Sequence, residues 1–121
     1  QFTAAAAAYS AEASVPLLIL PFAASLLTAK LVSAKTTASS DSSNKWLSSI
    51  LNKTEGVDIS SADLNTDDAE LVAFAAQSFD LTAANTDLAA GDVITGSIQS
   101  VGSPTTLQHF SWLFQLTFIP R

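Results

Sequence analysis

The 121-residue chain has no cysteine and no methionine, and its basic residues are few. Without cysteine it cannot form a disulfide, a thiolate metal site or a thiol nucleophile. Only five residues are Lys or Arg, against eleven Asp or Glu, and the basic residues do not cluster. Because a nucleic-acid surface needs concentrated positive charge, we expect no direct binding to nucleic acid.

Charge of either sign is scarce. Charged residues make up 13% of the chain, while hydrophobic residues make up 48%. Soluble domains usually have about 25% charged residues, so much of this surface must consist of Ser, Thr, Ala, Asn and Gln. A neutral surface of small side chains suits contact with other subunits. We therefore expect a homo-oligomer, most simply a trimer.

The chain also lacks a long, uninterrupted hydrophobic run. Its longest apolar stretch, residues 15–32, is broken by Pro16 and Pro21 and contains Lys30. A membrane-spanning helix needs about 20 consecutive apolar residues, so we expect no membrane partner. The stretch is a poor signal peptide as well, because no basic region precedes it. Since the chain begins at Gln1 rather than Met, we expect further residues before it in the native protein.

Groups for catalysis and metal binding are equally sparse. His109 is the only histidine, and no motif brings a nucleophile, a base and an orienting acid together. The acidic run 63–68 begins like an EF-hand loop but lacks the glycine and the bidentate glutamate that complete one. We predict that the protein is not an enzyme and needs no cofactor or metal. A looser calcium site that includes Asp58 or Glu70 is the alternative.

Short segments that alternate apolar and polar residues, separated by polar turns, recur along the chain. This pattern is typical of an antiparallel β-sandwich. Strands are expected over residues 14–21, 25–34, 45–52, 57–59, 93–101 and 114–121, and a helical turn leading into a strand within 70–81. Segment 45–52 also fits one or two helical turns, but a helix there would be apolar all round. Prolines at both ends of 14–21 place that strand at a sheet edge.

The last two alternating segments are joined by Gly102-Ser103-Pro104, which predicts a hairpin-like pair. At the start of the first of them, Gly91 permits a positive φ. Asp92 can then accept hydrogen bonds from nearby backbone N–H groups. A chain that ends on a strand has its terminus held in the core.

The first residues differ from the rest in composition. Residues 1–13 include five consecutive alanines and are expected to form an extended or partly helical arm. Residues 14–121 are expected to form a single β-sandwich domain. Ordering such an arm costs about 1–2 kcal/mol per residue in backbone entropy, so contacts must offset it. We expect the arm to reach a neighbouring copy or another protein.

Aromatic residues gather in the closing segment. With period-two alternation, one face carries Phe110, Trp112, Phe114, Leu116 and Phe118. A small core can absorb the last three, which leaves the first two for a subunit interface, where buried aromatic residues concentrate binding energy. The predicted interface residues are Phe2, Tyr9, Phe110 and Trp112. The alternative is that the whole row belongs to the core.

The order of these segments resembles that of small jelly-roll-like virion proteins of tailed bacteriophages, of the capsid decoration, cement or head-fibre type. The resemblance is carried by the proline-flanked first strand and by segments 27–32, 44–47, 79–81, 87–95, which includes Leu-Ala-Ala-Gly-Asp-Val, 100–102 and 116–118. It implies a jelly-roll-like sandwich that binds and stabilises the outer surface of a phage head as a homo-oligomer. The implied partner is the major capsid protein, and the implied location is the outer capsid surface of a virion.

Two other functions fit the composition. An extracellular carbohydrate- or receptor-binding sandwich would use Trp46, Trp112 and Tyr9 to stack on sugars. An extracellular filament subunit would join its neighbours through the N-terminal arm by strand addition.

Overall fold

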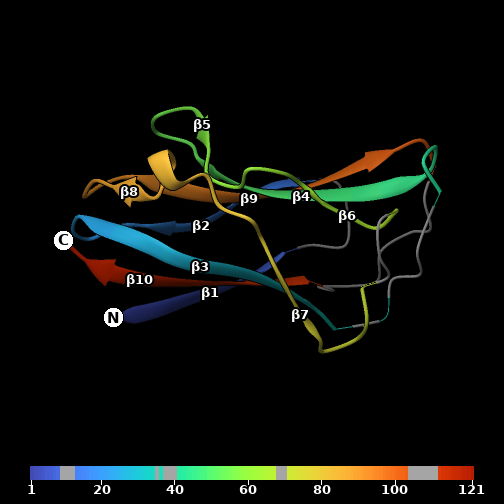
Figure 1. Ribbon diagram of the computed structural model, residues 1–121, viewed down its shortest axis with the longest axis horizontal. Helices are drawn as coiled ribbons and strands as arrows, with labels where there is room; N and C mark the ends of the chain where they lie inside the picture. The colour runs from blue at the N-terminus through green and yellow to red at the C-terminus, as the bar shows by residue number, and fades with distance from the viewer. Residues whose placement is uncertain (9–12, 35, 37–40, 68–70, 104–111) are drawn as a thin grey trace.

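A computed structural model describes residues 1–8, 13–34, 36, 41–67, 71–103 and 112–121. These residues are nearly all β-strand, and they form two antiparallel sheets packed face to face (Figure 1). The predicted all-β sandwich is therefore confirmed. None of the described residues belongs to a helix long and apolar enough to cross a membrane.

Each sheet is built from strands that are far apart in the sequence. Sheet A has the order β1 (Phe2–Ala8), β10 (Trp112–Pro120), β3 (Ala24–Ser33) and β7 (Ala76–Ser78), with β8 (Asp87–Leu88) also paired to β3. Sheet B has the order β2 (Ala13–Ile19), β9 (Val93–Val101), β4 (Lys45–Asn52) and β5 (Val57–Asp58), with β6 (Leu64–Asn65) also paired to β4. A short 3₁₀ helix, η1 (Ala83–Asn85), precedes β8. Because the chain crosses repeatedly between the sheets and the first strand lies beside the last, the topology is that of a jelly roll.

The N-terminal segment was expected to be extended or partly helical, and residues Phe2–Ala8 are extended. Strand β1 pairs with β10 over its whole length, from Phe2 opposite Phe118 to Ala8 opposite Trp112. Five alanines cannot hold a helix alone, and the exposed edge of β10 supplies hydrogen bonds to an extended chain.

The predicted hairpin between the last two strands is wrong. Strand β9 lies in sheet B between β2 and β4, whereas β10 lies in sheet A between β1 and β3. Alternation predicts that each segment is a strand with one apolar face, but it does not say which strand is its neighbour. Here the apolar face of each strand points into the core from its own sheet, so β9 and β10 are not neighbours within one sheet.

The core fills the space between the sheets. Its largest fully buried side chains include Trp112, Phe114 and Phe118 from β10 and Ile94 and Ile98 from β9. Gly96 faces Phe114 so closely that an added Cβ would lie 2.8 Å from the ring Cζ. The absence of a side chain at this position lets the two sheets approach over the ring.

A β-bulge in β3 changes the phase of its alternation. Thr28 pairs with Thr117 and Leu26 with Phe118, so Leu27 has no partner in the register. Leu26 and Ala29 are buried, while Leu27 is 45% exposed. Regular alternation over the expected strand 25–34 would place Leu27 and Ala29 on one face, but the extra residue shifts the pattern by one position and separates them.

The turn before β9 is formed as expected. Gly91 has a φ of +91°, and the buried Asp92 carboxylate accepts hydrogen bonds from the Ala89 N–H at 3.0 Å and from Asn52 Nδ2 at 2.8 Å. The Asn52 Oδ1 atom in turn accepts bonds from the N–H groups of Thr54 and Glu55. This network ties the start of β9 to the end of β4.

The helical turn expected before β7 is absent from the described residues 71–75. The Ala75 N–H donates to the Val72 carbonyl, which closes a β-turn, and the Phe74 N–H donates to the Ser33 carbonyl of β3 at 2.7 Å. Phe74 has a φ of +62°, the one positive φ outside glycine among the described residues. Pairing with β3 decides the conformation here, and the spacing of apolar residues does not.

Candidate functional site

The described residues contain no group of three or more His, Cys, Asp or Glu side chains that could hold a metal ion. His109 and Glu70 lie outside the described residues. Asp58 and Asp63 of the acidic loop are both exposed, and burial of part of Asp63 together with the charge of Asp58 raises the pKa of the Asp63 carboxyl. The calcium alternative stays a prediction.

The predicted interface residues fall in three different environments. Phe2 is half-buried, with its ring stacked on Phe118 at 4.9 Å and edge-on to Phe22 at 5.3 Å. Trp112 is 1% exposed and belongs to the core of this chain. Tyr9 and Phe110 lie outside the described residues. The structure therefore does not bring these four residues together on one described surface.

The tryptophans proposed for sugar stacking are both covered. Trp46 is 7% exposed and Trp112 is 1% exposed, and both belong to the core cluster. Sugar stacking needs an open ring face. In this conformation neither indole offers one.

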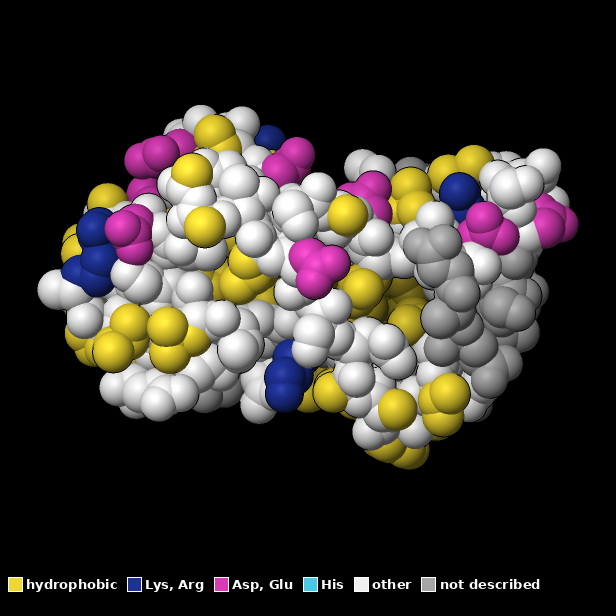
Figure 2. Space-filling model, viewed as in Figure 1, with side chains coloured by type: hydrophobic (Ala, Val, Ile, Leu, Met, Phe, Trp, Pro, Cys, Tyr) yellow, Lys and Arg dark blue, Asp and Glu magenta, His cyan; other side chains and the backbone are white. Residues whose placement is uncertain are grey.

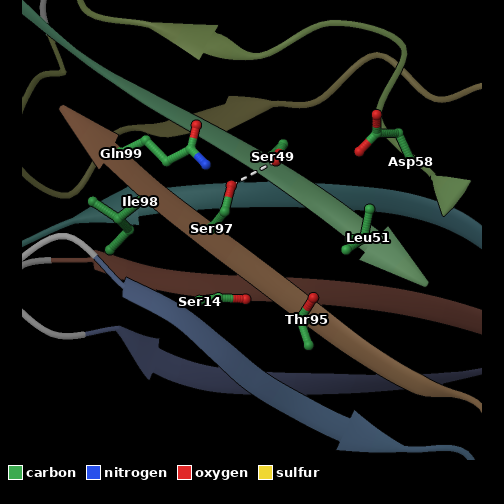
Figure 3. A pocket seen from close by; sticks show the side chains of 8 residues that line it. All are labelled: Ser14, Ser49, Leu51, Asp58, Thr95, Ser97, Ile98 and Gln99. Carbon is green, nitrogen blue, oxygen red and sulfur yellow. Dashed lines mark hydrogen bonds between the residues drawn. The ribbon is translucent and has the colours of Figure 1, made fainter. Parts of the chain in front are cut away.

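A shallow groove of about 410 Å³ lies on the outer face of sheet B (Figure 3). Most of its lining residues are polar, with one carboxylate and two aliphatic residues: Ser14, Ser49, Leu51, Asp58, Thr95, Ser97, Ile98 and Gln99. Alternation places the hydroxyls there, because the odd-numbered residues of β4 and β9 point away from the core. The Ser49 and Ser97 hydroxyls already bond each other at 2.6 Å. This hydroxyl groove suits a neutral, polar ligand.

The outer face of sheet A is different in character. Three exposed aliphatic residues lie on it, Leu27 and, from β10, Leu113 and Ile119, which are 41–46% exposed. Lys30 is the only charged residue in β1, β10, β3 and β7. The fifth strand of the sheet, β8, carries the exposed Asp87, which pairs with Ser25 at the start of β3 and lies 3.5 Å from the Arg121 guanidinium. We call this surface, with Lys30 at its centre, the sheet A face.

The loop at the β7 edge of the same sheet carries the most exposed large hydrophobic residue among those that the structure describes. Phe74 is 78% exposed and Val72 is 48% exposed. A non-glycine residue in the left-handed region is uncommon, and strained conformations of this kind gather at functional sites. Sequence reasoning did not single out Phe74, because a helical turn leading into a strand was expected within residues 70–81.

Charge is unevenly distributed over the molecule. Glu55, Asp63 and Asp67 lie in the connections that follow β4, on the side of sheet B. On the face seen in Figure 2, acidic side chains lie above the middle of the view, together with basic ones, and none is seen in the lower part. Apart from Asp87, whose charge faces Arg121, the sheet A half therefore offers a neutral or negatively charged surface little repulsion.

Comparisons of the chain with protein-family models, with curated proteins and with solved structures give no match.

Proposed function

We propose that the protein is a non-enzymatic structural component of a virion, a homo-oligomeric decoration protein that binds and stabilises the outer surface of a phage head. The observation that carries this proposal is the exposed apolar surface formed by the sheet A face with Phe74 and Val72, in which strands β1, β10, β3 and β7 contain no acidic residue. A surface of this kind marks a site of contact with another macromolecule. Its partner in the proposal is the major capsid protein.

Phe74 is the best anchor on that surface. Its ring is almost fully open to water, so its burial in a complex removes a large apolar area from solvent. Aromatic anchors of this kind dominate the energy of many interfaces. The backbone at Phe74 holds a conformation that costs about 1–3 kcal/mol for a residue other than glycine. Glycine or asparagine at this position would make the protein more stable, so the phenylalanine is best explained by a role outside the fold.

The two halves of the molecule suit the two environments of a bound decoration protein, which has the capsid on one side and solvent on the other. The sheet A face, with its single lysine, fits against an assembled lattice. The acidic connections of sheet B then face the solvent, where net negative charge favours solubility. In this arrangement the carboxylates need not be desolvated on binding.

Stabilisation needs no chemical step. A protein that binds the assembled lattice and not its separated subunits stabilises that lattice by mass action. Each tenfold excess of free protein over the dissociation constant adds about 1.4 kcal/mol per site.

The jelly roll is a fold-level analogy that points two ways, since viral capsid domains and lectins both use it. The hydroxyl groove favours a second candidate, a carbohydrate-binding module. Its Ser and Thr hydroxyls, with Gln99 and Asp58, supply the donors and acceptors that a sugar needs. Substitution of Gln99 and Asp58 by Ala would abolish glycan binding in that case and leave particle binding unchanged.

The experiment is co-sedimentation of the purified chain with intact particles that lack it. Phe74→Asn removes the ring and introduces a residue that tolerates the left-handed backbone conformation, so the fold should remain intact. We expect about tenfold or greater loss of affinity, since an anchor residue is worth roughly 2 kcal/mol or more. The control is Ile19→Thr, which removes a 67% exposed hydrophobic residue from the end of β2 in the other sheet. Equal binding by wild type and Phe74→Asn, or no binding by wild type, would refute the proposal.

A further inference from the structure

The four edges of the sandwich differ in how well they are protected against pairing with another chain. At one side of the molecule the edge strands are very short, three residues in β7 and two each in β8, β5 and β6. At the other side, β2 contains Pro16, and its register with β9 shifts between Pro16 and Leu18. Short strands, prolines and bulges are the usual protection of an edge.

Strand β1 has none of these protections. It is seven residues long, and its register with β10 runs without a shift from Phe2 to Ala8. Its sequence, Phe-Thr-Ala-Ala-Ala-Ala-Ala, has no proline and no charged residue. No described strand pairs with its second edge. A long, regular and uncharged edge is a template for a further strand.

The surroundings of β1 allow two copies of the chain to meet there. The protein has a net charge of −6, so two copies repel each other over most approaches. Strands β1 and β10, and the neighbouring edge strand β2, contain no charged residue. β1 and β2 contact each other across the two sheets, so this side of the sandwich consists of uncharged strands. A second copy is therefore the partner that fits this edge.

We propose that β1 pairs antiparallel with β1 of a second copy, which joins the two A sheets into one continuous sheet across a two-fold axis. Antiparallel pairing of identical strands has this symmetry. An axis through Ala5, the middle residue of β1, places it opposite Ala5 of the partner subunit. The bulge and Pro16 in β2 prevent the same continuation in sheet B. This inference deepens the homo-oligomer part of the proposed function and gives it two-fold symmetry in place of the expected trimer.

Joining the sheets also extends the surface proposed to bind the particle. The two sheet A faces become neighbours on one continuous sheet, with Leu113 and Ile119 contributed by β10 of each copy. Two linked faces bind more tightly than one, because the second contact forms within an existing complex.

Charge substitutions at Ala5 test the pairing. Ala5 is the middle residue of β1 and lies opposite Gln115 in the register with β10. Ala5→Lys and Ala5→Glu each place like charges opposite one another across the axis, and both should weaken self-association about tenfold or more. An equimolar mixture of the two should restore association, as a heterodimer visible by native mass spectrometry. The control is Ala76→Lys, which makes the same change on the exposed part of the short edge strand β7.

Sedimentation velocity of the full chain over a wide concentration range supplies the readout. A wild-type dimer that is weakened by Ala5→Lys, kept by Ala76→Lys and restored in the mixture supports the inference. A monomeric wild type overturns it, as does a dimer that Ala5→Lys leaves unchanged. Particle binding by a monomeric chain would refute this inference alone. A dimer that never binds particles would refute the decoration role alone.

Discussion

Substitution of Gly96 by alanine tests the packing of the two sheets directly. A Cβ at this position would lie 2.8 Å from the Phe114 Cζ atom and 3.0 Å from both Cε atoms. The ring cannot easily move away, because Phe114 is fully buried and stacks on Phe79 at a centroid distance of 6.1 Å. One added methyl group must therefore displace a ring that supports both sheets.

The expected cost follows from two opposing effects. Overpacking a close-packed core costs about 1–3 kcal/mol. Replacing glycine with alanine in a strand recovers about 0.5–1 kcal/mol by reducing the freedom of the unfolded chain. We therefore expect Gly96→Ala to lower the free energy of unfolding by about 1–2 kcal/mol, measured by urea denaturation with an unchanged m-value.

A double-mutant cycle with Phe114→Leu isolates the contact. Phe114→Leu alone should destabilise the protein, because it leaves a cavity in the core. In that background the new methyl group of Gly96→Ala has room, so its cost should fall by about 1 kcal/mol or become a gain. Additive effects of the two substitutions would refute this account of the packing.

Three further substitutions or conditions give separate tests. Phe2→Ala should cost about 1–2 kcal/mol through loss of the stack on Phe118, measured by thermal unfolding; an unchanged melting temperature would mean that β1 is not docked. Asn52→Ala should cost about 2–3 kcal/mol, because it leaves the buried Asp92 carboxylate short of a partner; a urea midpoint like that of wild type would contradict the network. Hydrogen bonds from the Ser43 backbone, then from the Asn44 side chain and backbone, lower the pKa of the Asp41 carboxyl. Its contribution to the turn should thus be present above the usual Asp pKa and be lost as the pH falls through the lowered value. An NMR titration of Asp41 with an ordinary midpoint would contradict those bonds.

Local alternation was sufficient to predict strands whose two faces differ clearly. Strands β4 and β9 have the predicted bounds, Lys45–Asn52 and Val93–Val101, because every second residue faces the core. The Gly91-Asp92 turn was also predictable, since its backbone conformation and its hydrogen bonds depend on neighbouring residues. These features depend on the segment itself.

The features that the sequence did not predict depend on residues far away in the chain. The alanine run in β1 has no alternation, and its conformation comes from pairing with β10. The sheet to which β10 belongs, and the bulge at Leu27, are set by contacts between distant strands. The positive φ at Phe74 likewise follows a bond to the Ser33 carbonyl. The candidate binding surface could not be predicted for the same reason.

The most direct test of the decoration role is the heat stability of particles with and without this protein. Particles that lack it should be disrupted at a lower temperature, and added wild-type chain should raise that temperature up to a plateau at full occupancy. Phe74→Asn should need a higher concentration to reach the same plateau. Particles whose disruption temperature does not change at any concentration of the wild-type chain would contradict the account.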